Sequence, residues 1–508
     1  MNSFLLVFMA FVPIIWLLVS LGVLKMASHK ACLIAVIITS IISYAGFNMP
    51  GVLIGQSIVE GSVYSILSIC WVIIAALFVY NITLKTGALD VIQSMLYKIS
   101  SDRRIQALVI AFAFGGFLEA VAGFGTAVAI PAGILIAMGF QPLKAAVVCL
   151  VANTVPVAFG VLGVPVITLA EVTGLELGKL AFDVCIQLIP FAVVLPLLLV
   201  YIVAGKLSKV KGVVCISVLS GVAFSVGQTL TAVYVGVELA AVVGSLSSLI
   251  LIIVWCKLFP IKDIFTFDNQ EVKEEVVEKI TTKQALIAWI PYILALVFIV
   301  IVQLFPVLKE GPFVISKQFY FGEGGKAVRF AWLSNGGTLL FLSAVISGFI
   351  QGMNGSEILA TFVGTIKQVK LSILTIVLVV SLAKLMTYSG IVETSAAFVA
   401  AASGRFFPAL SPFVGALGTF ITGSDTSSNI LFGNLQQQTA LKLDMDQYWI
   451  AAGNGSGATA GKMISPQSIS IAASSTNYAA KESDMMRSTL KYCVLYVVLM
   501  GVFVYVLN

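Results

Sequence analysis

Four ionisable residues lie inside long apolar stretches of this sequence. Glu119 lies in GGFLEAVAGFGTA, Asp425 in GTFITGSDTSSN and Lys462 in NGSGATAGKMISP, whereas Lys384 lies in the apolar run at residues 371–388. A charge in apolar surroundings is costly unless it is paired or faces water. Two acids and two bases are therefore compatible with two structural ion pairs, and Lys384 can also reach the edge of the apolar region or bond to backbone carbonyls. The alternative is a polar binding site built from some of the four.

These residues would do different chemistry in such a site. A carboxyl group in a medium of low dielectric constant can exchange a proton near neutral pH. Glu119 has only apolar and small neighbours, so it is a candidate for carrying a proton. Asp425 lies among Ser, Thr and Asn residues that can hydrogen-bond a carboxylate, and it is also a candidate cation ligand. Lys462 suits an anionic substrate, or Asp425 when no substrate is bound. The single histidine, His29, lies in the first predicted loop.

Residues that bend the backbone or expose it surround these charges. Gly123 and Gly125 follow Glu119, and glycine lets the backbone approach a ligand closely. A helix that begins at such a place has free N–H groups that favour a carboxylate. The alternative role of glycine in a membrane helix is close packing against a neighbouring helix. The candidate substrate-binding residues are Lys462, Ser427, Ser428, Asn429, Asn153, Thr154, Asn454, Gly123, Gly125 and Thr126. The candidate proton-coupling residues are Glu119 and Asp425, and Lys384 is interpreted as a structural charge.

Two segments about 300 residues apart share one spacing of helix-breaking residues. Asparagine, glycine and proline follow one another at the same intervals in both, as Asn153, Gly160 and Pro165 and as Asn454, Gly461 and Pro466. Within hydrocarbon, an unwound backbone is tolerated only where protein or a polar cavity satisfies its N–H and C=O groups. The pair therefore predicts two broken helices, at residues 145–169 and 448–470, that flank a binding site.

The composition indicates a membrane protein. Of 508 residues, 59% are hydrophobic and only 10% are charged, which excludes a string of soluble domains. The net charge of +6 comes from short loops and does not indicate nucleic-acid binding. The seven scattered cysteines are interpreted as packing residues. The sequence has no P-loop, no metal-ligand spacing and no Rossmann motif, so we expect neither a metal nor a cofactor. ATP-driven transport is disfavoured unless a separate subunit supplies the energy.

Twelve apolar runs are predicted to cross a hydrocarbon core of about 30 Å. The first run is predicted to be a retained membrane helix and not a cleaved signal peptide, because further spans follow and no A-x-A-like cleavage site is present. Two other segments, 105–138 and 408–440, are too long for one crossing and are predicted to be re-entrant hairpins; a pair of thin full spans is the alternative. The twelve runs are residues 4–24, 31–47, 63–82, 145–169, 181–204, 210–231, 238–258, 285–305, 337–350, 371–388, 448–470 and 490–507.

The basic residues indicate an orientation. Counting each hairpin as no net crossing places twenty of the 29 Lys and Arg residues on one side and seven on the other, with Lys384 and Lys462 inside the spans. The positive-inside rule makes the first side cytoplasmic and leaves both termini outside.

The same order of elements is predicted in both halves. A small residue, a glycine and then an acid follow the span before each hairpin, as Thr86, Gly87 and Asp90 and as Ser389, Gly390 and Glu393. These two spans run in opposite directions, so the repeats are inverted and their hairpin tips face each other near the midplane. The predicted organisation is N-terminal helices at 1–62, a first inverted repeat at 63–204, connecting helices at 210–350 with a cytoplasmic loop at 259–284, and a second inverted repeat at 354–508.

Four blocks carry a specific family resemblance. They are SDRRIQALVIAFAFGGFLEAVAGFGTAVAIPAGIL from Ser101, ANTVPVAFGVLGVPV from Ala152, GTFITGSDTSSNILFGNLQ from Gly418 and NGSGATAGKMISPQSI from Asn454. They resemble the bacterial L-lactate permease family, and the resemblance covers essentially the whole chain. It implies a symporter of the bacterial cytoplasmic membrane that carries L-lactate, and often D-lactate and glycolate, together with a proton. Through a wider ion-transporter superfamily it also implies scaffold and transport domains, elevator-type motion and a homodimer.

The leading hypothesis is therefore proton-coupled symport of a small 2-hydroxy monocarboxylate. Its partners would be lactate or glycolate and the lipid bilayer, without nucleic acid. The substrate carboxylate would meet Lys462 and helix N-termini, and its hydroxyl would meet nearby Ser, Thr or Asn groups. A sodium-coupled carboxylate symporter and a passive organic-anion channel are the alternatives. An intramembrane enzyme or sensor is disfavoured, because the sequence offers no nucleophile paired with a base and no appended soluble domain.

Overall fold

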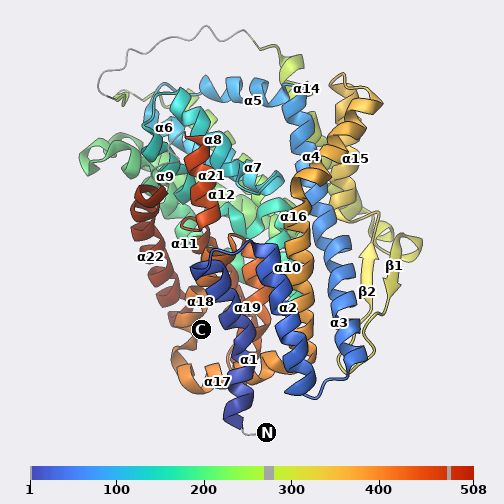
Figure 1. Cartoon of the computed structure of the whole chain (residues 1–508). Coiled ribbons are helices and arrows are strands. Elements are labelled where there is room, and N and C mark those ends of the chain that lie inside the picture. Colours follow the sequence, from blue (N-terminus) through green and yellow to red (C-terminus); the bar gives the residue numbers. More distant parts are fainter. Residues whose placement is uncertain (1–2, 262, 268–279, 477–481) are drawn as a thin grey trace.

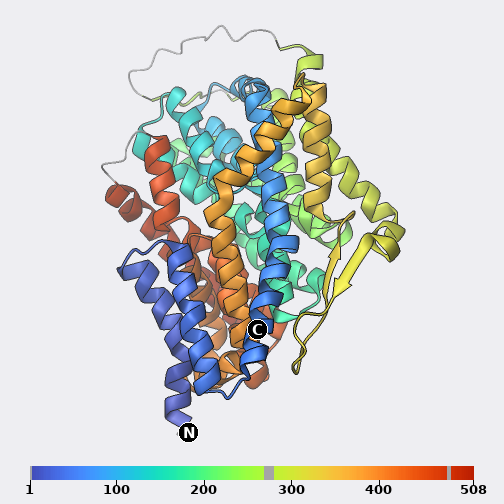
Figure 2. The same ribbon diagram turned by 45° about the vertical axis from the view of Figure 1, so that its right-hand side comes forward.

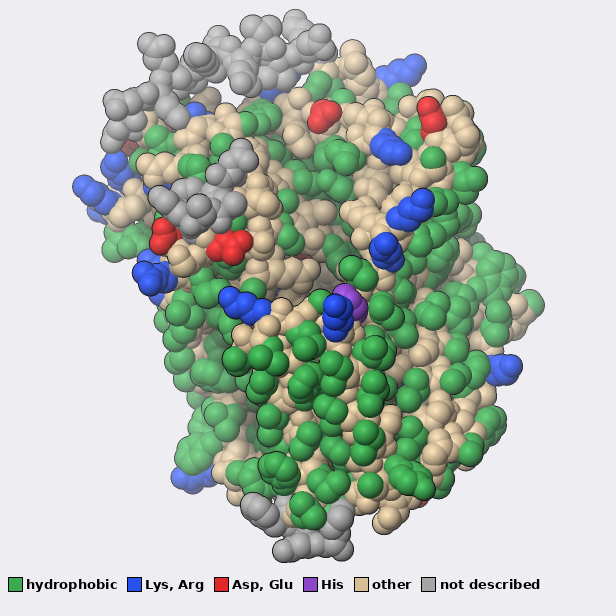
Figure 3. All heavy atoms as spheres, in the orientation of Figure 1, with side chains coloured by type: hydrophobic (Ala, Val, Ile, Leu, Met, Phe, Trp, Pro, Cys, Tyr) green, Lys and Arg blue, Asp and Glu red, His purple; other side chains and the backbone are tan. Residues whose placement is uncertain are grey.

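The chain folds into a bundle of helices, many of which run along the long axis of the molecule (Figure 1). The computed structural model describes residues 3–261, 263–267, 280–476 and 482–508. Within these residues, twelve helices are long and apolar enough to cross a membrane. Hydrophobic side chains cover most of the face drawn in Figure 3, and most of its charged side chains lie in the upper half. The predicted class, an all-α polytopic membrane protein, is confirmed at this level.

The N-terminal third begins with a helical pair and a long helix. Hydropathy predicted only residues 63–82 of this long helix, but α3, a π-helical segment and α4 form one 35-residue run, Gly51–Lys85. The predicted division between residues 62 and 63 therefore falls inside a helix. In the same way, α16 extends the predicted span 371–388 to 34 residues. The elements are α1 (Ser3–Leu17), α2 (Ser28–Ala45), α3 (Gly51–Tyr64), α4 (Trp71–Lys85) and α16 (Gly355–Tyr388).

Both long helices end in the same turn. Gly87 and Gly390 adopt left-handed φ angles of 72° and 80°, which glycine reaches without the strain that a Cβ atom would bring. The chain then continues into α5 (Ala88–Tyr97) and α17 (Ile391–Ser403), whose first turns contain Asp90 and Glu393. These two helices lie at opposite ends of the molecule (Figure 1).

The predicted hairpin 105–138 consists of two helical arms and a short tip. The first arm comprises α6 (Arg103–Ala107), a π-helical segment (Leu108–Phe114) and α7 (Gly115–Val121), and the second arm is α8 (Thr126–Ala137). The tip has positive φ angles at Gly123, Phe124 and Gly125, of 59°, 50° and 86°. The first arm is buried from Arg104 to its end at Val121. Protein therefore surrounds its irregular backbone, as a membrane interior requires.

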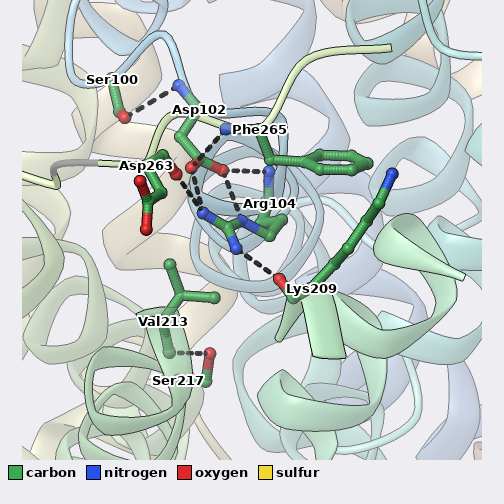
Figure 4. Close-up of polar contacts among 8 residues, drawn as sticks. All are labelled: Ser100, Asp102, Arg104, Lys209, Val213, Ser217, Asp263 and Phe265. Carbon is green, nitrogen blue, oxygen red and sulfur yellow. Dashed lines mark hydrogen bonds and ion pairs between the residues drawn. The ribbon is translucent and has the colours of Figure 1, made fainter. Parts of the chain in front are cut away.

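A buried ion pair fastens the base of this hairpin (Figure 4). Asp102 caps α6 by accepting a hydrogen bond from the backbone N–H of Arg104 at 2.8 Å, and it pairs with the Arg104 guanidinium at 2.6 Å. The guanidinium also donates to the carbonyls of Lys209 and of Asp263, the latter at 2.8 Å, while the backbone N–H of Phe265 donates to Asp102 at 3.0 Å. Two other loops are thus tied to the base of the hairpin.

The second hairpin lies toward the other end of the molecule. The arms of hairpin 408–440 are α18 (Phe407–Thr422) and α19 (Asp425–Lys442), and Gly423 at the tip has a φ angle of 74°. The chain continues through α20 (Gln447–Lys462) and α21 (Pro466–Ser475). In Figure 1, α17, α18 and α19 lie in the lower half and α6, α8 and α9 in the upper half. The two hairpins therefore occupy opposite halves of the molecule.

The helices are interrupted in the two segments where the breaker spacing predicts it, but in different ways. Between α9 (Pro142–Ala152) and α10 (Gly160–Thr173) the chain forms a short 3-10 turn, and Val161, Leu162 and Gly163 then have φ angles of 45°, 56° and 76°. The second interruption comprises only residues 463–465, before Pro466 begins α21. Asn454 and Gly461, expected at this break, lie instead inside continuous α20. The prediction was wrong on this point.

Close packing explains why α20 carries so many glycines. A Cβ atom on Gly457 would collide with the backbone of Pro412, and one on Gly461 with the backbone of Ala416. From the facing helix, a Cβ atom on Gly415 would lie 2.9 Å from the backbone nitrogen of Ala458. The glycines of α20 therefore bring it against α18, as small residues do in membrane helix pairs, instead of unwinding it.

The remaining elements complete the bundle. Gly336–Ile350 has 15 residues and is shorter than the helices that qualify as membrane spans, whereas the hairpin arm Arg103–Val121 does qualify. The observed twelve helices therefore do not coincide one for one with the predicted spans. A two-stranded antiparallel sheet, absent from the prediction, projects from one side (Figure 2). These elements are α11 (Leu177–Ala204), α12 (Val214–Tyr234), α13 (Ala240–Leu258), α14 (Thr282–Leu304), β1 (Val314–Lys317), β2 (Val328–Ala331), α15 (Gly336–Ile350) and α22 (Glu482–Val506).

Candidate functional site

The tip of the first hairpin lies against the first helix break. A Cβ atom on Gly160 would lie 3.0 Å from Glu119 Oε1 and 3.3 Å from its Cγ, and one on Gly123 would collide with Val161. Glycine at position 160 therefore leaves room for the Glu119 side chain. Asn153, the C-cap of α9, lies next to the same carboxyl group. The structure thus brings together three residues that the sequence placed on separate motifs.

The tip of the second hairpin lies against the second break. Lys462, the last residue of α20, donates a hydrogen bond to the Gly423 carbonyl at 3.0 Å. A cation at a helix C-terminus and an acid at a helix N-terminus both interact favourably with the helix dipole, and Asp425 is the first residue of α19. The side chain of Ser424 caps this helix by accepting from the Ser427 N–H at 3.3 Å.

The charges of the two halves act on one another. The Lys462 ammonium group interacts electrostatically with both Glu119 and Asp425, and the two carboxyl groups also interact with each other. Within the described parts of the chain, Lys462 forms no ion pair of 4.0 Å or less with either carboxyl group. The lysine therefore holds the hairpin tip and lies near both acids without neutralising one of them by direct contact.

Several polar atoms at this place are buried without a partner. Among the described residues, no group meets the distance and angle of a hydrogen bond to Glu119 Oε2, to either carboxyl oxygen of Asp425 or to either amide atom of Asn153, although Asn153 lies close enough to interact with Glu119, as Thr419 does with Asp425. The same is true of the Thr419 hydroxyl group, which lies beside Asp425. Buried polar groups in native proteins are almost always hydrogen-bonded. A cluster of unpaired ones indicates a place where water, a proton or a polar ligand completes the bonding.

Three of the predicted substrate-binding residues are occupied by protein partners. Asn429 donates to the Pro165 carbonyl at 2.9 Å and accepts from Asn454 at 2.8 Å, and Gln436 donates to Asn454 at 2.6 Å. Ser428 donates to the Gly415 carbonyl at 2.8 Å. These bonds join α19 to α10, α18 and α20, so in this conformation the residues position the site's helices.

Gln436 was not predicted from the sequence. It lies seven residues after Asn429 in α19, which places the two on one face of the helix. The available signal was this spacing of amide side chains along an otherwise buried helix.

The remaining predicted residues shape the tip and break of the first half. The Thr126 hydroxyl donates to the Gly123 carbonyl at 2.8 Å, and the Thr154 hydroxyl donates to the Val151 carbonyl at 2.8 Å. A Cβ atom on Gly125 would collide with Ile471 of α21, so the first tip also touches the second broken helix. No group of three or more His, Cys, Asp or Glu residues in the described ranges could hold a metal ion.

Lys384 has a partner that the sequence did not suggest. Its ammonium group lies 3.0 Å from Glu60 Oε1, and the Tyr388 hydroxyl donates to the same oxygen at 2.7 Å. Tyr320, from the segment between β1 and β2, stacks on Tyr388 with ring centroids 3.8 Å apart. Glu60 was missed because it precedes the predicted span at residues 63–82, although the helix that contains it begins at Gly51.

A helical membrane protein with two hairpin tips and two helix breaks around a buried charged cluster has the architecture of a membrane transporter. Over residues 6–508 the sequence matches the family model of L-lactate permease. It is 41% identical over 450 residues to an L-lactate permease of Streptococcus iniae, covering 87% of this chain and 93% of that protein. It is 35% identical over 531 aligned positions to the glycolate permease GlcA of Escherichia coli (strain K12), covering 97% and 94%. The chain belongs to the L-lactate permease family and is a transporter, not an enzyme.

A solved structure shows the same fold at low sequence identity. MtrF of Neisseria gonorrhoeae has a TM-score of 0.52 and 12% identity, with 96% of each chain covered. This likeness concerns the fold alone.

Proposed function

We propose that this permease is a proton-coupled symporter of L-lactate and related 2-hydroxy monocarboxylates such as D-lactate and glycolate. The observation that carries the proposal is the cluster of buried, unpaired polar atoms on Glu119, Asp425 and Asn153 near the Lys462 ammonium group. The named relatives, an L-lactate permease and a glycolate permease, support the substrate class. The substrate carboxylate would meet Lys462 and the N-terminal end of α8 or α21, where free N–H groups favour an anion.

Charge balance favours a proton as the companion of the substrate. The cluster contains one cation and two carboxyl groups, and a net change of charge in a buried site is costly. A monocarboxylate that enters with one proton on Glu119 or Asp425 leaves the net charge of the cluster unchanged. No group of acidic side chains resembling a metal site occurs in the described ranges, but Asp425 still makes sodium coupling the alternative to test.

Proteoliposomes that contain a pH dye test the coupling. A gradient of one pH unit is about 1.4 kcal/mol, so electroneutral 1:1 symport accumulates substrate up to about tenfold. We expect lactate-dependent internal acidification, and we expect uptake to persist when choline replaces sodium. Uptake without acidification, or an absolute need for sodium, contradicts proton coupling. Failure to accumulate lactate against its gradient would indicate a passive anion channel.

Variants assign the coupling group. We expect at least one of Asp425→Asn and Glu119→Gln to lose gradient-driven accumulation, because an amide cannot carry the coupled proton. Glu393→Gln is the matched control, since Glu393 lies on α17 with 72% of its side chain exposed. If both site variants accumulate lactate as the control does, neither acid couples transport. Counterflow of radiolabelled lactate, competed with glycolate, pyruvate and dicarboxylates, defines the substrate range.

We further propose that the two halves are inverted repeats of an elevator-type transporter. The left-handed glycine turns at Gly87 and Gly390, the hairpins in opposite halves of the molecule and the paired breaks support this organisation. The excess of basic residues on one side supports a cytoplasmic location for that side, with both termini outside. A homodimer in the bacterial cytoplasmic membrane remains a prediction. Labelling of a cysteine placed at Asn508 by a membrane-impermeant maleimide in intact cells tests the orientation, and labelling only after lysis would contradict it.

A further inference from the structure

One face of α21 lies against both hairpin tips. A Cβ atom on Gly423 of the second tip would lie 3.0 Å from Gln467 Cβ and 3.2 Å from its Cδ. A Cβ atom on Gly125 of the first tip would lie 3.2 Å from Ile471 Cγ2. Gln467 and Ile471 are one helical turn apart on the same face, with a rise of about 6 Å between them. Figure 1 shows α21 beside α8, the second arm of the first hairpin. The first two turns of α21 therefore bridge the two tips.

This face of α21 is accessible, and its glutamine has a free amide. The side chain of Gln467 is exposed and that of Ile471 is half-buried, whereas Ser468 and Ile469 between them are buried. The Gln467 amide makes no hydrogen bond within the part of the chain that the structure describes. A glutamine amide can both donate and accept hydrogen bonds. Gln467 is therefore able to bind a polar group of a molecule that lies between the tips.

The charged cluster adjoins the same face. Lys462 donates to the Gly423 carbonyl at 3.0 Å, so its ammonium group and the Gln467 side chain lie at the same tip residue. The two carboxyl groups of the cluster lie on hairpin arms that these tips join. A molecule held by Lys462 between the tips would therefore meet an amide on one turn of α21 and an apolar side chain, that of Ile471, on the next.

We propose that Gln467 and Ile471 determine which small acids the permease accepts, an inference that rests on the proposed binding of the substrate carboxylate by Lys462. The Gln467 amide would hydrogen-bond to the hydroxyl group on the second carbon of the substrate. Ile471 would contact the methyl group that lactate carries on the same carbon and that glycolate lacks. A hydrogen bond of about 3 Å on one side and a van der Waals contact of about 4 Å on the other bridge the separation of the two side chains.

Competition between substrates in proteoliposomes tests the role of Gln467. Uptake of radiolabelled L-lactate is competed with glycolate, which lacks the methyl group, and with propionate, which lacks the hydroxyl group. Gln467→Met keeps an unbranched side chain against Gly423 but removes the amide. We expect the preference for lactate over propionate to fall about two- to tenfold, which is the contribution of one neutral hydrogen bond. The preference for lactate over glycolate should not change, because both carry the hydroxyl group.

Ile471→Ala should give the opposite pattern. Loss of the contact with one methyl group should lower the preference for lactate over glycolate about fourfold. The preference for lactate over propionate should not change, because both carry the methyl group. The matched controls are Gln141→Met, at an exposed N-cap of α9 without a side-chain capping bond, and Ile41→Ala, at a position of α2 that is 63% exposed. Both controls should keep both native preferences.

The preferences are ratios, so they do not depend on how much folded protein each vesicle contains. Gln467→Ala, which removes the amide without adding bulk beside Gly423, must reproduce the result of Gln467→Met. Equal changes for all three acids, or preferences that match those of the controls, would mean that Gln467 and Ile471 only pack against the tips, and would overturn this assignment alone. A native chain that transports lactate without preferring it to propionate would overturn the role of Gln467. A native chain that transports none of the three acids would instead refute the proposed function itself.

Discussion

Replacing Glu60 by glutamine tests whether Lys384 is a structural charge. Glu60 lies on α3 with 1% of its side chain exposed, and Lys384 lies on α16 with 20% exposed. Glutamine keeps an oxygen that can accept from the Tyr388 hydroxyl, so the substitution removes the charge and preserves much of the shape. Lys384→Met removes the other charge. The double variant leaves a neutral contact between the two helices.

The geometry sets the expected size of the effect. At 3.0 Å and an effective dielectric constant of about 20, the attraction between the two charges is about 5.5 kcal/mol. Desolvation of each ion costs several kcal/mol, so the intact pair adds little over a neutral contact. Removing one partner leaves the other uncompensated, at a cost of about 3–5 kcal/mol. We expect the cost of Glu60→Gln to lie near the lower end of this range, because water can still reach the Lys384 ammonium group. The free energy of unfolding of the double variant should lie within about 1 kcal/mol of that of the native protein.

Unfolding in mixed micelles and lactate uptake in proteoliposomes give the two readouts. Glu393→Gln is again the control, because its pair with Lys442 is 3.6 Å long and exposed, and such pairs contribute about 0–1 kcal/mol. A double variant that is no more stable than either single variant would refute the ion-pair reasoning. A double variant that is stable but does not transport lactate would refute the structural role and place Lys384 in the transport mechanism.

Two other substitutions test the supports of the hairpins. Asp102→Asn should lower the free energy of unfolding by about 3 kcal/mol, because it leaves Arg104, which is 4% exposed, without its counter-ion; an unchanged unfolding midpoint would show that the backbone carbonyls suffice. Gly457→Ala should cost about 1–3 kcal/mol or more through its clash with Pro412. Gly364→Ala is the control, because no atom lies within 4 Å of its Cβ position, and it should not measurably lower the free energy of unfolding. Fluorescence-detected gel filtration measures the yield of each folded variant. Comparable yields of the two variants would contradict the packing argument.

The sequence predicted those parts of the site that depend on local backbone chemistry. Both hairpin tips and both interruptions lie in segments where glycine, proline and asparagine interrupt apolar runs. The prediction was wrong where one residue type serves two purposes. Glycine at position 461 is compatible with an unwound chain and with close helix packing, and only the position of Ala416 on the facing helix decides for packing.

Contacts between distant segments could not be predicted from the sequence. Asn429 lies 264 residues from Pro165, to whose carbonyl it donates, and Glu60 lies 324 positions before Lys384. Hydropathy also placed Glu60 outside the membrane span, because it detects only the apolar part of a helix. These partners depend on which helix faces which, and no local pattern encodes that choice.

By itself, the sequence determined that this protein is a helical membrane transporter of the L-lactate permease family, with charges and helix-breaking residues in two separate segments. Composition and backbone preferences are properties of each segment, so they can be read without a structure. The tertiary structure alone decided that Glu119, Asp425 and Lys462 act on one another, that Asn429 and Asn454 tie helices together, and that Lys384 belongs to Glu60. A hydrogen bond requires a donor and an acceptor about 3 Å apart, and the attraction between two charges weakens as their separation grows. Only the packing of the helices sets those distances.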